Sequence, residues 1–317
     1  MLRYLTRRTG QALLVLWLAY TASYALLYQI PSNPISVRLA DPDNPVSPDD
    51  AARILAYYGL DRPVWEQYLG SLQRLFEGDI GFSLISGERV STLVAKAIPS
   101  TLQLTALGLV FAILLALAIV SIVSLTRWES LRRALELLPS LFVSVPMFWL
   151  GLLVIQLFSF RLGMFVAVDD QAPSSLLFAA LAMALPVSAP LAAVLMASVQ
   201  AVYHEPFVEV LKTKGVGAIR IYLRHVLRNS LMPALTVLGI TTGELVAGAV
   251  VTETIFSRPG LGHLTERSVA NQDLPVIQAV VLIAAAAFVL ANWLVDVVHP
   301  LVDPRVRTTP APKESAT

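Results

Sequence analysis

Long apolar stretches separated by short polar segments dominate the chain. Each stretch is long enough and carries little enough charge to form a membrane-spanning helix, which needs about 20 mostly apolar residues. The pattern therefore predicts an all-α polytopic membrane protein with six transmembrane helices. The predicted spans are 10–30, 101–125, 136–160, 174–201, 233–254 and 275–298.

Two of these spans need a further argument. The fourth is interrupted by Pro186 and Pro190, which membrane helices tolerate where neighbouring helices satisfy the freed carbonyl groups. The first is too long for the core of a signal peptide, and no small-x-small cleavage pattern follows it. We expect both stretches to be retained as spanning helices.

The segment 31–100 lies outside the predicted spans and has its own pattern. Its first part, 31–48, contains five prolines and is typical of an irregular loop. Ser47-Pro48-Asp49-Asp50 predicts a helix start, and that helix would end at Gly59. A second helix should follow Pro63 and end near Gly78. Its apolar stripe consists of Trp65, Leu69, Leu72 and Phe76.

The charge distribution predicts the orientation in the membrane. Only 14% of the residues are charged, against roughly 25% in a typical soluble domain, which excludes a disordered chain or a coat for nucleic acid. Lysine and arginine are enriched on the cytoplasmic side of membrane proteins. Fourteen of the 23 lysines and arginines lie in 1–9, 126–135, 202–232 and 299–317. Six spans place these four segments on one side, so both termini are predicted to be cytoplasmic.

Sequence motifs for catalysis are absent. No glycine is followed by lysine, so there is no Walker-type phosphate loop, and neither His-Glu-x-x-His nor Gly-x-Ser-x-Gly occurs. The absence of cysteine excludes disulfides, thiolate catalysis and cysteine metal sites. The four histidines show no metal-ligand spacing. We therefore predict a protein that is not an enzyme on its own and binds no metal or cofactor, so uphill transport would need a partner or an ion gradient.

The loop 202–232 between the fourth and fifth spans is the most informative segment. Pro206 can end the preceding helix and let another begin at a different angle, and Gly215 is a plausible stop for that short helix. Between them we expect an amphipathic helix with its apolar face formed by Phe207, Val210 and Leu211. From physical chemistry alone, a connector held by anionic lipid headgroups is an equal alternative.

The same loop carries a family resemblance. Lys214-Gly215, followed by Arg224-His225-Val-Leu-Arg228-Asn229-Ser-Leu-Met-Pro233, resembles the "EAA" loop of ABC importer permeases, in particular the B-type subunit of the dipeptide/oligopeptide/nickel family. The resemblance continues in the same order along nearly the whole chain. Further similar runs begin at Gly59, Gly78, Val145, Gly248 and Asp303.

The resemblance implies a type I ABC importer permease in the bacterial inner membrane, forming half of a translocation path for di- or oligopeptides. It implies a second homologous permease, two ATP-binding subunits that hold ATP and Mg, and an extracytoplasmic solute-binding protein, with no nucleic acid. We divide the chain into four parts. The cytoplasmic start with the first helix is 1–30, and the extracytoplasmic segment is 31–100. The five-helix core with its coupling loop is 101–298, and the cytoplasmic tail is 299–317.

The resemblance assigns ATPase coupling to the loop, with two departures from the family pattern. Glu209-Val210-Leu211 stands at the small-residue "EAA" position, and Pro206 stands where the family often has aspartate. This places the docking contacts in doubt but not the role. The predicted coupling residues are Phe207, Glu209, Val210, Leu211, Lys212, Lys214, Gly215, Arg224, His225, Arg228 and Asn229.

One acidic residue lies inside a predicted span. Glu244 is about 11 residues into the fifth span, roughly 16 Å deep at about 1.5 Å per residue, and ionisable groups at this depth are usually functional. It is predicted either to line the path and pair with a cationic group of the substrate, or to pair with the partner permease or be satisfied inside the bundle. Small residues at 239, 243 and 247 suit helix packing on another face.

Five further polar residues are candidates. Thr241, Thr242 and Gln156 are candidate path residues, although polar residues in spans more often bond neighbouring helices. Glu253 and Arg258 lie at the outer end of the fifth span and are candidates for an outer gate or a contact with the binding protein. A structural role for Glu253 is the alternative.

Other functions stay open at this stage. Within the same family, a nickel or metal-chelate importer is the nearest alternative, and the sequence does not decide the length or sequence preference of a peptide. A gradient-driven secondary transporter is disfavoured because no inverted repeat is visible and intramembrane acid–base chemistry is sparse. A membrane enzyme such as an intramembrane protease is disfavoured by the missing motifs. Co-purification of ATP-binding subunits would separate the importer from the last two classes.

Overall fold

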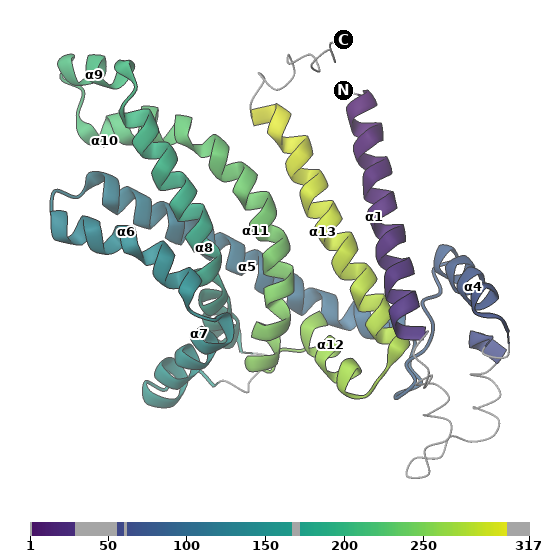
Figure 1. The fold of residues 1–317 in the computed structure, drawn as a ribbon. Coiled ribbons are helices and arrows are strands. Elements are labelled where there is room, and N and C mark those ends of the chain that lie inside the picture. Colours follow the sequence, from purple (N-terminus) through teal and green to yellow (C-terminus); the bar gives the residue numbers. More distant parts are fainter. Residues whose placement is uncertain (1, 29–55, 60–61, 167–171, 303–317) are drawn as a thin grey trace. The chain divides into compact units, whose positions relative to one another are not determined.

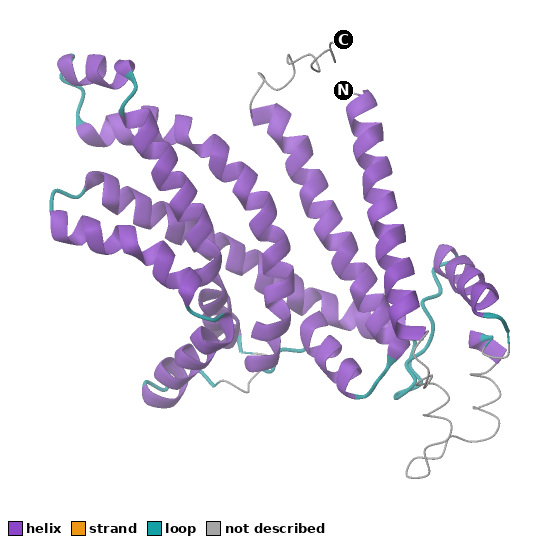
Figure 2. Ribbon diagram, in the orientation of Figure 1, coloured by secondary structure: helices purple, strands orange, loops and turns teal. Residues whose placement is uncertain are grey.

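The protein is almost entirely helical (Figures 1 and 2). Within the described ranges, the only pairing of β type is an isolated bridge between Phe82 and Arg89. The all-α prediction is confirmed. The computed structural model describes residues 2–28, 56–59, 62–166 and 172–302.

The chain separates into two compact units, which are described separately below. The first unit comprises Met1–Leu102 and Arg258–Ala286, and the second comprises Gln103–Ser257 and Ala287–Thr317. Two long helices, α5 (Val90–Leu125) and α13 (Leu274–Val302), contribute residues to both units.

Most predicted spans correspond to one long helix. α1 (Leu2–Tyr28), α5 and α8 (Pro173–Tyr203) are each long and apolar enough to cross a membrane alone. α11 (Leu227–Ile255) and α13 coincide with the fifth and sixth predicted spans. By length and composition, the described residues hold three spans, or up to five if each bent helix pair counts as one. The predicted number of six is therefore not confirmed.

The predicted third span is broken. α6 (Glu129–Ser144) meets the pair formed by α7 (Met147–Val154) and the π-helical segment η1 (Ile155–Arg161) at an angle of 106°. Pro146 lacks an N–H group, and its ring disfavours helical backbone at Val145, which is extended with φ −97° and ψ 125°. The predicted span over 136–160 is therefore bent at Pro146.

In the first unit, the predicted helix after Pro63 is present as α4 (Val64–Phe76). It is followed by Gly78 at φ +81°, a conformation that glycine adopts without strain. Tyr68 and Ser71 of α4 hydrogen-bond to α1, whereas the predicted apolar stripe stays outside this contact, with Phe76 84% exposed. The predicted helix start at 47–50 lies outside the described residues.

The first unit also ties distant segments together. Asp273 accepts hydrogen bonds from the Ser83 hydroxyl at 2.5 Å and from the Leu84 amide at 3.1 Å. The Leu261 amide donates to Thr101 Oγ1 at 2.8 Å, which joins α12 (Leu261–Ala270) to α5. Burial raises the pKa of the Asp273 carboxyl, and the hydrogen bonds that it accepts oppose this rise. These contacts hold the loop at 83–86 in a defined position beside α12 and the start of α13.

The second unit is built on α8, which packs against α11, α6 and α7. Buried alanines of α8 allow close approach of its neighbours, and Gly243 does the same on α11. A Cβ atom at Gly243 would lie less than 2.5 Å from the ring of Phe288 in α13. The predicted packing role of this glycine therefore agrees with the structure.

Replacing Gly243 with leucine should destabilise the protein. The added side chain would push the Phe288 ring away from α11, and overpacking of this kind costs about 1–3 kcal/mol. We expect a lower thermal midpoint for the purified protein in detergent. Combining Gly243→Leu with Phe288→Ala should restore much of the loss, whereas an unchanged midpoint in the single variant would show that these helices are not in close contact.

Candidate functional site

The loop after α8 forms a separate short helix. α8 ends at Tyr203, and α9 (Pro206–Thr213) begins at Pro206, where the missing N–H group is not needed for a helical bond (Figure 1). Val208 is completely buried against the core of the second unit, with Leu211 packed beside it one turn later. The predicted break and the new helix are confirmed.

The predicted apolar face of α9 is divided between two surfaces. Leu211 packs inward, whereas Phe207 and Val210 are 37% and 50% exposed. Val208 and Leu211, an i, i+3 pair, form the inner face, about 75° around the helix from the centre of the predicted apolar face. Two apolar side chains of a short surface helix are therefore available to another molecule.

Gly215 ends α9 in a defined turn. Its φ is +76°, a left-handed conformation that a residue with a side chain adopts only with strain. The Val216 amide donates to the Leu211 carbonyl at 3.1 Å, and the Gly215 amide donates to the Lys212 carbonyl at 2.9 Å. This pair of bonds is a Schellman motif, and it satisfies carbonyl groups that the helix end leaves free. The predicted stop at Gly215 is confirmed.

The return segment is anchored to the core. α10 (Ala218–Ile221) continues through the π-helical segment η2 (Tyr222–Val226) into α11. Tyr222 is completely buried, and its hydroxyl lies 2.9 Å from the Ser121 hydroxyl of α5. Val208 and Tyr222 therefore hold both arms of the loop against the second unit, so a force on α9 would be transmitted to α5 and α11.

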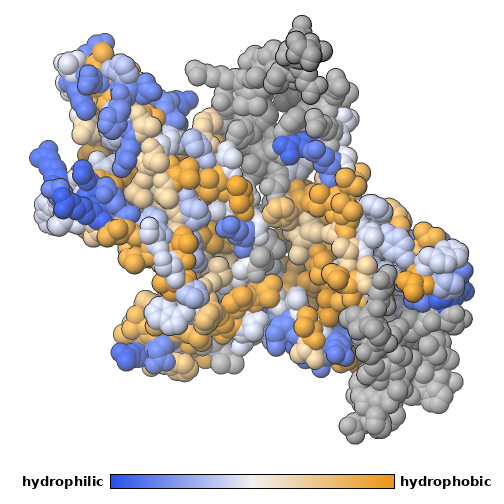
Figure 3. All heavy atoms as spheres, viewed as in Figure 1, coloured by the Kyte–Doolittle hydropathy of each residue, from blue (hydrophilic) through white to orange (hydrophobic). Residues whose placement is uncertain are grey.

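The outer side of this loop combines apolar and basic groups. We call it the loop surface and define it by its exposed apolar side chains, which are Phe207, Val210, Ile219 and Leu223. The basic residues around it are exposed as well, and Figure 3 shows polar residues gathered over α9 and α10. Among the predicted coupling residues, Leu211 and His225 are half-buried and the others are exposed.

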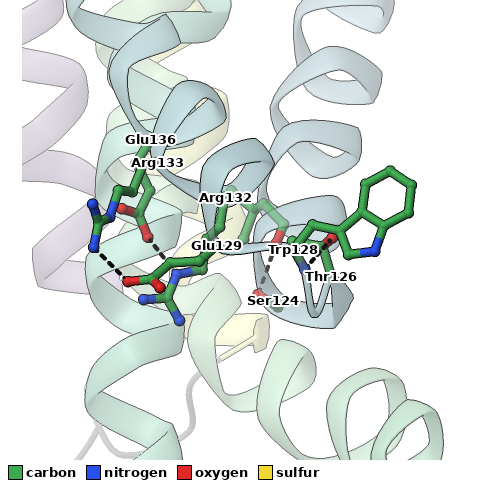
Figure 4. A network of polar contacts seen from close by, with 8 residues as sticks. Ser124, Thr126, Trp128, Glu129, Arg132, Arg133 and Glu136 are labelled. Carbon is green, nitrogen blue, oxygen red and sulfur yellow. Dashed lines mark hydrogen bonds and ion pairs between the residues drawn. The ribbon is translucent and has the colours of Figure 1, made fainter.

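A second polar end of this unit lies at the turn between α5 and α6 (Figure 4). Arg133 pairs with Glu129 at 2.5 Å, and Arg132 pairs with Glu136 at 3.6 Å. Trp128 points away from this network and is 74% exposed. An exposed tryptophan beside paired charges is typical of a membrane–water boundary.

Glu244 lies on an uncovered stripe of α11. Its carboxylate is exposed, and its side chain forms no hydrogen bond or ion pair with any residue that the structure describes. From Asn229 to Glu244 the exposed positions of this stripe recur every three or four residues, so they form one face of this part of the helix. The exposed stripe consists of Asn229, Pro233, Thr236, Ile240 and Glu244.

The structure does not bring the other path candidates to this stripe. Thr241 is buried and donates to the carbonyls of Val237 and Leu238. Thr242 donates to the Leu238 carbonyl at 2.7 Å, so both hydroxyl groups are satisfied within their own helix. Gln156 is exposed on η1, a different helical segment from the stripe.

Glu253 and Arg258 are both buried. Glu253 is completely inaccessible, and Arg258 is 5% exposed. In this structure neither side chain lies on a surface that a docked protein could reach. The burial of Glu253 agrees with its structural alternative, and the contact of these two residues with a binding protein stays a prediction.

Comparison with family models adds a second kind of evidence. Residues 108–308 match the model described as binding-protein-dependent transport system inner membrane component. Residues 1–105 match the model for the N-terminal part of such membrane components. Together these matches cover nearly the whole chain.

Curated relatives and solved structures agree with these models. The di/tripeptide transport system permease protein DppB of Pseudomonas aeruginosa is 32% identical, with 97% of this chain and 99% of the relative covered. The glutathione transport system permease protein GsiC of Escherichia coli K12 is 31% identical with the same coverage. A structure of the MetNI methionine ABC transporter in inward-facing conformations is similar in fold, with a TM-score of 0.56, 17% identity and coverage of 66% of this chain and 96% of that one.

Proposed function

We propose that this chain, which belongs to the family of inner membrane components of binding-protein-dependent transport systems, is a permease subunit. The transporter would be an ATP-driven importer of short peptides. The observation that carries the proposal is similarity over 97% of the chain to permeases named for di- and tripeptides, dipeptides and glutathione. All three are named for small peptides, which supports a peptide substrate here.

The proposed complex supplies what this chain lacks. A second homologous permease would complete the path, two ATP-binding subunits would hold ATP and Mg, and an extracytoplasmic solute-binding protein would deliver the peptide. The loop surface is the proposed contact with an ATP-binding subunit, because its apolar side chains are exposed on a segment that is fixed to the core. ATP binding would draw the two loops together and shift the permease pair from inward-open to outward-open.

The exposed stripe of α11 is the proposed lining of the path. Polar and acidic side chains are costly against lipid, so this face needs water, substrate or a partner permease beside it. Glu244 is the negative charge on the stripe, and a peptide carries a positive charge at its amino terminus. We therefore assign Glu244 a contact with the cationic end of the substrate.

Replacing Glu244 with glutamine should reduce uptake of peptides that have a free amino terminus by about 10-fold, because hydrogen bonds to charged groups contribute roughly 1.5–3 kcal/mol. The change keeps the shape of the side chain and removes its charge. Uptake of the same peptide with an acetylated amino terminus should change little. Equal uptake of the free peptide by both proteins would remove Glu244 from substrate binding.

The proposed function is tested by isolating the complex from membranes through a tag on this chain. A second permease and ATP-binding subunits should co-purify, and the reconstituted complex should hydrolyse ATP faster when the binding protein and a dipeptide are added. Stimulation by a nickel chelate but not by peptides would favour the metal-chelate alternative. Transport that persists without any ATP-binding subunit would contradict the proposal.

A further inference from the structure

A hollow of about 430 Å³ lies within the first unit, beside α12. We call it the α12 hollow. Its walls come from the loop at 83–86, the start of α5, α12 and the turn that leads into α13. Polar side chains that line it include Ser86, Lys96, His263, Arg267 and Asn271.

The chain topology places the α12 hollow on the extracytoplasmic side. The loop at 202–232 is predicted to be cytoplasmic, and α11 leads from it to α12 across the membrane. The segment at 83–86 belongs to the region 31–100, which is predicted to lie on that same outer side. The hollow is therefore accessible to extracytoplasmic proteins rather than to the ATP-binding subunits.

The walls of the hollow are held by hydrogen bonds over long sequence distances. Asp273, which lines the hollow, accepts hydrogen bonds from the Ser83 hydroxyl and the Leu84 amide, and Thr101 accepts one from the Leu261 amide at the start of α12. Asn271 fixes the end of α12 by donating its side-chain amide to the Arg267 carbonyl at 2.7 Å. A hollow with such walls is formed before a ligand arrives, which lowers the entropy cost of binding.

Among the described residues that line the hollow, one cationic side chain has no acidic partner. Lys96 pairs with Glu88 at 2.6 Å, and His263 Nδ1 lies 3.8 Å from Glu266. Arg267 is exposed and forms no ion pair with a residue that the structure describes. The guanidinium of Arg267 is therefore available to an anionic group that enters the hollow.

We propose that the α12 hollow receives an acidic side chain of the solute-binding protein and that Arg267 binds its carboxylate. A guanidinium group pairs with a carboxylate through two parallel hydrogen bonds, which gives this contact both strength and orientation. The hollow is large enough for a carboxylate side chain together with neighbouring atoms of the docked surface. This inference rests on the proposed function, and it locates the binding-protein contact away from the buried Glu253 and Arg258.

The test compares two charge reversals on the same side of the membrane. Arg267→Glu should weaken binding of the purified binding protein to the complete complex in nanodiscs by about 10-fold or more, since reversing one charge of a close pair leaves two like charges together. Arg62→Glu makes the same charge change on an exposed arginine outside the hollow. It should alter the Kd by less than about 2-fold. Equal Kd values for Arg267→Glu and the original complex would overturn the proposal.

A cross-linking experiment identifies the molecule in the hollow. The chain contains no cysteine, so Asn271→Cys introduces its only thiol. A benzophenone attached there should cross-link to the binding protein next to an acidic residue. Cross-linking only to the second permease or to lipid would also overturn the proposal. If the original complex binds no solute-binding protein at all, the proposed function itself fails, whereas binding that ignores Arg267 removes only this contact.

Discussion

Gly215→Pro should abolish peptide uptake while the protein still inserts into the membrane. Gly215 has φ +76°, and proline fixes φ near −65°. Proline also lacks the N–H group that Gly215 donates to the Lys212 carbonyl. The turn after α9 would therefore be lost, and the loop surface would no longer be held in its orientation.

Gly215→Asn is the matched control for this prediction. Asparagine is the residue that replaces glycine most often at such helix ends, and a Cβ atom here would meet no atom within 4 Å. Uptake of a radiolabelled dipeptide into cells should be near normal in this variant and absent in the proline variant. Full uptake with proline would show that the end of α9 has no part in coupling.

Changing both Phe207 and Val210 to aspartate should release the ATP-binding subunits from the complex. These side chains are exposed on α9 and belong to the loop surface, which is the proposed contact with an ATP-binding subunit. Placing two carboxylates in an apolar contact costs several kcal/mol, because each charge loses its water. We expect the amount of ATP-binding subunit that co-purifies with the tagged chain to fall by at least about 10-fold.

The control for the double variant is Phe76→Asp on α4. This phenylalanine is 84% exposed and belongs to the extracytoplasmic segment, so the same kind of substitution should leave co-purification unchanged. Yields and thermal midpoints of both variants should match those of the original protein, because none of the three changed positions is part of the core. Retention of the ATP-binding subunits by the Phe207 and Val210 variant would place the contact elsewhere.

Local backbone chemistry explains which features of the fold were predictable. Pro206 and Gly215 act on their own turns, so the limits of α9 follow from neighbouring residues alone. Pro146 acts locally as well, because proline disfavours helical backbone at the residue before it, but the angle of the bend does not follow from the apolar residues on both sides. The apolar stretches predicted the helices and not the bend between them.

Features that depend on distant residues were not predictable from a single sequence. The inner face of α9 is set by the core beneath Val208, and no local pattern distinguishes Val208 from Val210. The α12 hollow brings together segments about 190 positions apart, as the bond from Ser83 to Asp273 shows. For the same reason, the burial of Glu253 and Arg258 was not visible in their motif.

The central claim is that the loop surface is held by a separate ATP-binding subunit throughout transport. It is tested most directly by cross-linking from Val210→Cys, the sole thiol that the variant chain would carry, in the purified complex with and without ATP. We predict cross-links to an ATP-binding subunit in both states. Cross-links to lipid alone, or none in either state, would contradict the claim.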